Sequence, residues 1–163
     1  MGPDEEDDDS RRTLEFEDSV SIRRSKNEVW AFISDPENLV ECVPGAEDIN
    51  KLSEREYTFE IAQSIARFTI TLEGDVELVE MDEPDWILAD GSAYDDSTGS
   101  TFDVITAMEM TESDEDIKLI YRAELTMTGG IASVGARLAK RVIRSNVEEY
   151  FDNVKSALHE EAN

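Results

Sequence analysis

Residues 117–158 read IKLIYRAELTMTGGIASVGARLAKRVIRSNVEEYFDNVKSAL, and two hydrophobic periods follow one another in this stretch. Up to Met127, apolar and polar residues alternate, which is the pattern of a half-buried strand. After a Gly-Gly pair, apolar residues recur at helical spacing as far as Leu158, which predicts a long amphipathic helix over about residues 131–160. Because a helix with a single apolar face must be buried against another element, we expect it to lie across a sheet.

The preceding part of the chain supplies that sheet. Between residues 46 and 128, short segments of alternating apolar residues are separated by turn residues, which predicts hairpin-linked antiparallel strands. A further strand is predicted over residues 13–22. Asp18 interrupts its apolar face, so we expect a bulge at Asp18-Ser19.

Two short helices are predicted after this first strand. Ser25 and Glu28 have the spacing of a capping box, in which each side chain accepts from the other's backbone amide. Asp35 followed by Pro36 supplies the N-cap and the first helical residue of a second helix. Local capping signals therefore mark where both helices begin.

The predicted architecture is an α+β helix-grip fold. It has a curved antiparallel sheet of six to seven strands around a long C-terminal helix, with two short helices after strand 1. Residues 1–10 contain little that could be buried and are expected to form an acidic disordered tail. Residues 11–163 are expected to form one domain.

The charge of the chain limits its partners. Forty acidic residues against 15 basic ones give a net charge of -25, which disfavours binding to nucleic acid. Acidic residues occur in every segment, which favours a halophilic protein over an acidic mesophilic one. A single cysteine, no signal-peptide pattern and no apolar run of membrane-spanning length predict a cytoplasmic protein without a transmembrane segment.

Five segments resemble the family of the G subunit of carbon monoxide dehydrogenase, which belongs to the START-like (SRPBCC, polyketide cyclase/dehydrase-like) superfamily. They are FEDSVSI at 16–22, EVWAFISDPE at 28–37, CVPGAE at 42–47, LEGDV at 72–76 and the stretch 121–135. The most specific element is VWAFISDPENLVECVPGAE, over 29–47, because its Asp-Pro and Pro-Gly spacing rarely arises by chance.

The resemblance implies a deep apolar cavity under the long helix and a non-catalytic accessory role beside a carbon monoxide dehydrogenase-like molybdenum hydroxylase. The expected ligand is an apolar small molecule such as a prenylated quinone or a lipid, and peripheral contact with a membrane stays open. The alternative is a polyketide cyclase-like enzyme that acts on an apolar substrate in the same cavity. Such an enzyme needs acid-base groups in the pocket, whereas the expected inward positions are nearly all aliphatic or aromatic.

Large apolar residues are the candidates for the cavity wall. From their pattern alone they would fill a core, whereas the resemblance favours a pocket. Asn146, and Gln63 in line with two apolar strand residues, either orient a ligand or are paired structural amides. The predicted lining is Trp30, Phe59, Phe68, Trp86, Phe102, Tyr121, Leu125, Val134, Leu138, Val142 and Asn146.

A basic stripe interrupts the acidic sequence. It consists of Arg137, Lys140, Arg141 and Arg144, which fall on one face of the predicted helix. These cations either pair with the protein's own carboxylates or dock a partner.

No catalytic residue, metal ligand or cofactor is predicted. The only histidine, His159, falls in the last turn of the predicted helix, so histidine-dependent catalysis and metal binding are disfavoured. Cys42 has no histidine nearby in the sequence and is expected to be a buried apolar residue.

Overall fold

The computed structural model describes residues 11–65, 68–114 and 116–161. The predicted tail, residues 1–10, lies outside the described residues, and the division into tail and domain stays a prediction. The elements follow the chain as β1 (Arg11–Ile22), α2 (Lys26–Ile33), α3 (Pro36–Cys42), β2 (Ala46–Lys51), β3 (Glu56–Ile65), β4 (Phe68–Asp82), β5 (Trp86–Asp95), β6 (Ser100–Ser113), β7 (Asp116–Thr128), η1 (Gly130–Ser133) and α4 (Ala136–Glu161).

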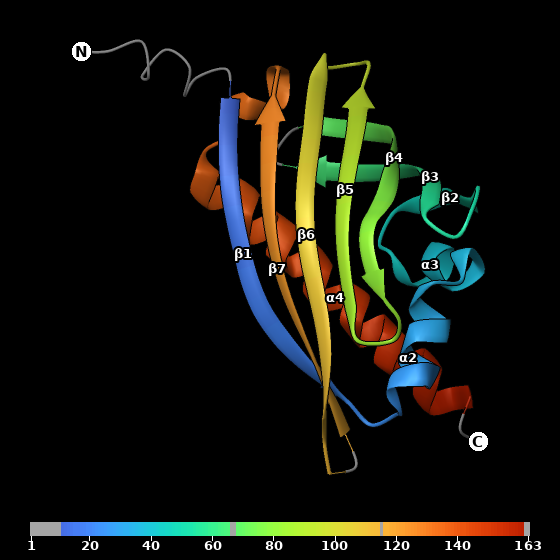
Figure 1. The fold of residues 1–163 in the computed structure, drawn as a ribbon. Helices are drawn as coiled ribbons and strands as arrows, with labels where there is room; N and C mark the ends of the chain where they lie inside the picture. Colours follow the sequence, from blue (N-terminus) through green and yellow to red (C-terminus); the bar gives the residue numbers. More distant parts are fainter. Residues whose placement is uncertain (1–10, 66–67, 115, 162–163) are drawn as a thin grey trace.

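The α+β helix-grip fold is confirmed. Seven strands form one sheet in the order β1-β7-β6-β5-β4-β3-β2, and every pair of neighbours is antiparallel. The first strand therefore pairs with the last one, and the strands between follow as successive hairpins. Figure 1 shows the curved sheet with α4 crossing one of its faces, and α2 and α3 beside the C-terminal half of α4.

Both short helices begin as predicted. The Ser25 hydroxyl accepts a hydrogen bond from the Glu28 amide, while the Glu28 carboxylate accepts one from the Ser25 amide, which completes the capping box. Asp35 caps α3 by accepting from the Glu37 amide, with Pro36 as the first helical residue.

The bulge expected at Asp18-Ser19 is wrong. Strands β1 and β7 pair in continuous register, with Asp18 opposite Tyr121 and Ser19 opposite Ile120. Asp18 therefore keeps the parity of its apolar neighbours. It is exposed, whereas Leu14 and Phe16, which have the same parity on the same strand, are buried.

The long helix begins five residues later than predicted, at Ala136 instead of residue 131. Residues Gly130–Ser133 form a separate 3-10 turn, after which Val134 is extended and ends it. The Ile131 amide donates to the buried Ser100 hydroxyl at 2.9 Å, and the Gly130 amide donates to the Thr98 carbonyl at 3.2 Å. Contacts with the β5–β6 hairpin, distant in sequence, therefore hold this turn out of the helix.

Asp95 ties the β5–β6 hairpin together. It is 2% exposed, and its carboxylate accepts hydrogen bonds from the Thr71 amide, the Ser97 hydroxyl, and the amide and hydroxyl of Thr98. Burial alone would raise the pKa of Asp95, but these hydrogen bonds outweigh it and lower the pKa to about 2. Because Thr98 and Ser100 also contact η1, this hairpin fixes the position where α4 starts.

The core has two clusters, one towards each end of α4. One packs Trp30 and Phe32 of α2 against β6, β7 and the C-terminal end of α4, around Val154 and Leu158. The other packs Phe102 and its neighbours from β1, β3, β4, β6 and β7 against η1 and the first turns of α4. The middle of α4 runs between the two clusters.

Candidate ligand cavities

Two adjoining cavities lie on the face of the sheet that the helices cover, one beneath α2 and α3 and the other beneath the middle of α4. The larger has a volume of about 960 Å³ and the smaller about 390 Å³, and each is large enough for a small apolar ligand. Both are lined by Phe59 of β3, Val76 of β4 and Tyr150 of α4. These three residues therefore mark the boundary between the cavities.

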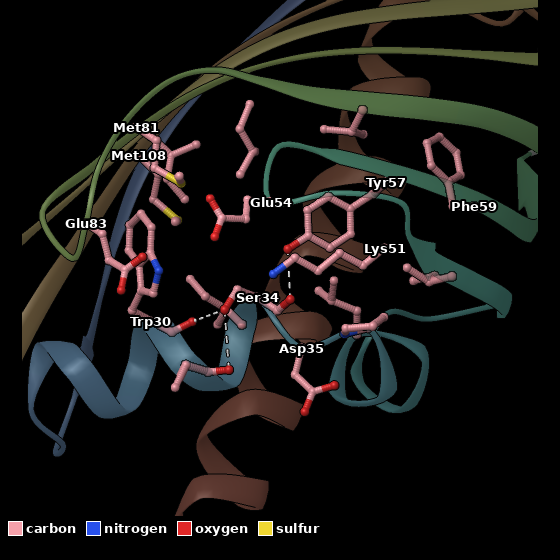
Figure 2. A pocket seen from close by; sticks show the side chains of 18 of the residues that line it. Trp30, Ser34, Asp35, Lys51, Glu54, Tyr57, Phe59, Met81, Glu83 and Met108 are labelled. Carbon is pink, nitrogen blue, oxygen red and sulfur yellow. Dashed lines mark hydrogen bonds between the residues drawn. The ribbon is translucent and has the colours of Figure 1, made fainter.

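The larger cavity is enclosed by α2, α3, the β2–β3 hairpin and the ends of β4 to β6. Figure 2 shows Trp30, Met81 and Met108 on one side of it and Tyr57 and Phe59 on the other. The Tyr57 hydroxyl donates to the Ser34 carbonyl at 2.8 Å, which joins β3 to the end of α2. This hydroxyl already has its hydrogen-bond partner, so Tyr57 contributes mainly an aromatic wall.

Charged side chains stand at the exposed rim of the larger cavity. Lys51, Glu54 and Glu83 line it and are all exposed. The Lys51 ammonium lies 5.8 Å from the centre of the Tyr57 ring, within the range of a cation–π contact. The larger cavity thus combines a polar opening with an interior of aromatic, aliphatic and methionine side chains.

The smaller cavity owes its space to small residues on β5. Gly91 and Ala93 line it, and they share the inward parity of Ala89, which is buried. With so little side-chain volume there, the middle of α4 does not fill the space beneath it. The other walls are mostly aliphatic and aromatic, including Leu72, Phe102, Leu125 and Ile143.

Two amides in the smaller cavity pair with each other. The Asn146 amide nitrogen donates to Gln63 Oε1 at 2.7 Å, and the Gln63 amide nitrogen donates to the Pro44 carbonyl at 2.7 Å. This pair links α4 to β3 and to the end of α3. Of the two roles considered for these residues, the structural one is therefore present.

Five of the predicted lining residues reach a cavity. Trp30 lines the larger one, Phe59 lines both, and Phe102, Leu125 and Asn146 line the smaller one. These residues come from α2, β3, β6, β7 and α4, so the fold brings together residues that lie far apart in the chain.

The other six predicted residues line neither cavity. Val134 is buried within a core cluster, and Phe68 and Val142 pack against that cluster. The Tyr121 ring stacks on Phe151, with 5.5 Å between ring centres. The remaining two are Trp86 and Leu138.

Trp86 and Leu138 face away from the cavities for different reasons. The inward face of β5 carries Ile87 and the small residues that follow it at every second position, so Trp86 has the outward parity. Leu138 is 39% exposed, whereas its neighbour Ala139 is fully buried. Ala139, three and four residues before Val142 and Ile143, holds the core-facing position at this turn of α4 instead.

Several wall residues were missed by sequence reasoning. No sequence pattern distinguishes a cavity wall from a filled core at Tyr57, Tyr150, Met81 and Met108. A detectable signal was the alternation of small residues in ADGSA, residues 89–93, because small residues at the inward positions of a strand leave space.

The lining limits the chemistry of the site. No histidine lines either cavity, and the described residues contain no group of three or more potential metal-ligating side chains. Asp35, Glu54 and Glu83 border the larger cavity from a helix cap and two turns, outside the strand positions that were expected to face inward. Asp35 is occupied as the cap of α3, and both glutamates are exposed, so these carboxylates belong to the rim.

The basic stripe runs along α4 beside β1. Arg137, Arg141 and Arg144 are exposed, and the Lys140 ammonium lies 5.6 Å from the centre of the Phe16 ring. The ion pairs seen among the described residues are Arg23–Asp116, Lys26–Asp85 and Arg122–Glu17. Within that part of the chain, no residue of the stripe forms an ion pair, although Lys140 and Arg144 line a groove together with Glu15, Glu17 and Glu124.

Within the described residues, no helix is both long enough and apolar enough to cross a lipid bilayer.

Comparison with solved structures shows the fold. A conserved protein from Geobacillus kaustophilus superposes with a TM-score of 0.83 at 18% identity, covering 90% of this chain and 96% of that one. The Zhui aromatase/cyclase from Streptomyces sp. R1128 gives 0.69 at 13% identity, covering 93% and 97%. A START superfamily protein from Mycobacterium smegmatis gives 0.65 at 11% identity, covering 90% and 97%.

Sequence comparison identifies the family. Comparison with curated protein sequences gave no match. The sequence profile of the carbon monoxide dehydrogenase G subunit (CoxG) matches residues 19–159, which span both short helices, strands β2 to β7 and nearly all of α4. This chain belongs to the CoxG family, that of the G subunit of carbon monoxide dehydrogenase.

Proposed function

We propose that this protein is a non-catalytic binding protein that holds an apolar small molecule in its two adjoining cavities. The observation that carries the proposal is the smaller cavity, which has almost entirely aliphatic and aromatic walls and adjoins a larger cavity with a polar rim. An amphiphile fits this arrangement, with its apolar part inside and its polar part near Lys51. A prenylated quinone and a lipid both have this character.

We further propose that the ligand serves a carbon monoxide dehydrogenase-like molybdenum enzyme in the cytoplasm. Support comes from the family, whose name is that of one component of such an enzyme. A carrier of an electron acceptor would be useful to an enzyme that must pass electrons onward. The basic stripe is the surface proposed to contact this partner, and an anionic membrane surface is the competing partner.

Cyclase-like catalysis is the alternative, because aromatase/cyclases share the fold. The rim carboxylates Glu54 and Glu83 are the acid-base groups nearest to such a site. Both are exposed at the opening instead of buried beside the apolar interior, where catalytic carboxylates usually acquire shifted pKa values. This placement favours binding over catalysis.

The ligand is tested by native mass spectrometry of the purified protein. We expect an additional mass from a co-purified apolar molecule, or saturable one-site binding of an apolar fluorophore when the protein has been stripped with organic solvent. Recovery of an apolar compound chemically converted during incubation would instead support the cyclase-like alternative. The absence of both a bound mass and saturable binding would contradict the proposal.

The partner surface is tested with the double variant Arg137→Gln, Arg141→Gln. Removing two exposed cations is expected to slow association with the molybdenum enzyme about tenfold in dilute buffer and to flatten its salt dependence, because charge steers encounter. The matched control is Lys118→Gln, Lys155→Gln, which makes the same charge change at exposed positions of β7 and of the C-terminal part of α4. Equal slowing of association by both variants would mean that only the net charge of the protein matters. Liposome flotation with the same proteins measures whether the stripe binds an anionic membrane surface instead.

A further inference from the structure

Tyr150 stands at the boundary between the two cavities. It lies near the middle of α4 and lines both the larger and the smaller cavity. Its ring packs edge-on against Phe151, with 5.0 Å between the ring centres, so the side chain is held by the core. A bound molecule that occupies both cavities must pass this side chain.

The Tyr150 hydroxyl has no hydrogen-bond partner among the described residues. The other polar groups that line the cavities near it are occupied: Tyr57 donates to the Ser34 carbonyl, and the amides of Gln63 and Asn146 are linked to each other. Tyr150 is partly buried and lines both cavities, so its hydroxyl is left to pair with whatever fills them. A ligand oxygen at this position would replace water as the partner of the hydroxyl.

The Tyr150 phenol is protonated, and so remains a donor, at neutral pH. Burial raises the pKa of Tyr150 well above its ordinary value, and the nearby Cys42 adds to this shift. Burial also raises the pKa of the Cys42 thiol, so neither group provides a charge. The group at the boundary is thus a neutral hydroxyl, which favours a neutral acceptor over a cation.

We propose that the Tyr150 hydroxyl donates a hydrogen bond to a carbonyl or ether oxygen of the bound molecule and so sets its position between the cavities. The inference rests on the proposed function, since it assumes that the cavities hold a ligand. It also narrows the ligand class to apolar molecules that place an acceptor oxygen at the boundary between the cavities. A pure hydrocarbon, or an amphiphile whose oxygens all lie at the rim near Lys51, would leave this donor unpaired.

The test compares two probes of nearly equal shape, 9-fluorenone and fluorene, which differ by a carbonyl in place of a methylene. Their affinities are measured by displacement of a bound apolar fluorophore from the full chain. In Tyr150→Phe, fluorenone affinity is expected to fall about threefold to tenfold, while fluorene affinity stays the same or rises slightly. The melting temperature should not fall, because the variant removes an unpaired hydroxyl and keeps the ring.

Tyr121→Phe is the matched control. It removes a phenol hydroxyl from the same face of the sheet, next to the same Phe151, but Tyr121 lines neither cavity. The fluorenone-to-fluorene ratio should be unchanged in this variant. If Tyr150→Phe weakens both probes equally, or neither, the inference is overturned while cavity binding stands. If neither probe binds the parent protein, the proposed function fails and the inference fails with it.

Discussion

Val76→Trp is expected to abolish ligand binding while leaving the protein folded. Val76 lines both cavities, and a tryptophan there would project a much larger side chain into their shared boundary. In a filled core, such overpacking typically costs about 1 to 3 kcal/mol. Because space adjoins this residue, we expect little change in melting temperature and at least about a 100-fold loss of affinity for an apolar fluorophore.

Val79→Trp is the control for this variant. Val79 lies on the same strand, is 47% exposed and lines neither cavity. The Val79→Trp protein should bind the fluorophore with the same affinity as the parent protein. A strongly destabilised Val76→Trp protein, together with a parent that binds no fluorophore, would show that the space behaves as ordinary core. Undiminished binding by a folded Val76→Trp protein would place the ligand elsewhere.

The melting temperature is expected to rise by about 10 °C or more between dilute buffer and molar potassium chloride. The net charge is -25, and several carboxylates lie directly opposite one another on paired strands. These pairs are Glu15 with Glu124, Glu56 with Glu77, and Glu60 with Glu73. Like charges at such positions are destabilising, and molar salt reduces the screening length to about 3 Å. For a chain of this size, each kcal/mol by which salt increases the free energy of unfolding raises the melting temperature by about 2 to 4 °C.

Substitution of Glu60 distinguishes local repulsion between carboxylates from the effect of the net charge of the protein. A hydrogen bond with the Glu47 side chain raises the pKa of Glu60, and burial and the charges of Glu47, Glu73 and Asp48 raise it further. Because the pKa of Glu60 is higher in the folded protein than in the unfolded chain, its protonation stabilises the fold. This stabilisation is present in full below the pKa of the unfolded chain and is lost as the pH rises through the pKa of the folded protein.

Glu60→Gln should therefore raise the melting temperature at neutral pH in dilute buffer by more than Glu80→Gln, which makes the same charge change opposite Leu88. The difference between the two variants should disappear in molar salt, as scanning calorimetry would measure. A parent melting temperature that does not change with salt would contradict the halophilic interpretation. Equal shifts for both variants would assign the effect to net charge alone.

Local signals in the sequence were sufficient to predict the elements and their order. The capping box at Ser25 and the Asp35-Pro36 pair act within one helical turn, so their structural result does not depend on the rest of the fold. The period-2 pattern of β7 likewise identified a strand buried on one face. The family could also be recognised, since the most specific of its five segments, residues 29–47, is contiguous and spans the two short helices.

Where a strand carries apolar residues at both parities, the sequence pattern could not predict which of its faces is buried. In β5, both parities carry apolar residues, so Trp86 seemed as suitable for the interior as Ile87. Only the pairing of β5 between β4 and β6 places Ile87 and the small residues after it beneath the helix. The start of α4 is a similar case, because the β5–β6 hairpin, through Ser100, holds η1 apart from it.

Sequence by itself determined the fold class, the two short helices, the acidic surface and the family, because each depends on local spacing or on composition. Only the tertiary structure decided which residues enclose space and which fill it. Gln63 and Asn146 meet across 83 positions, and Tyr150 reaches a boundary built by β3 and β4. Such contacts depend on how far the curved sheet stands from the helix, and that distance results from the volumes of all the side chains between them.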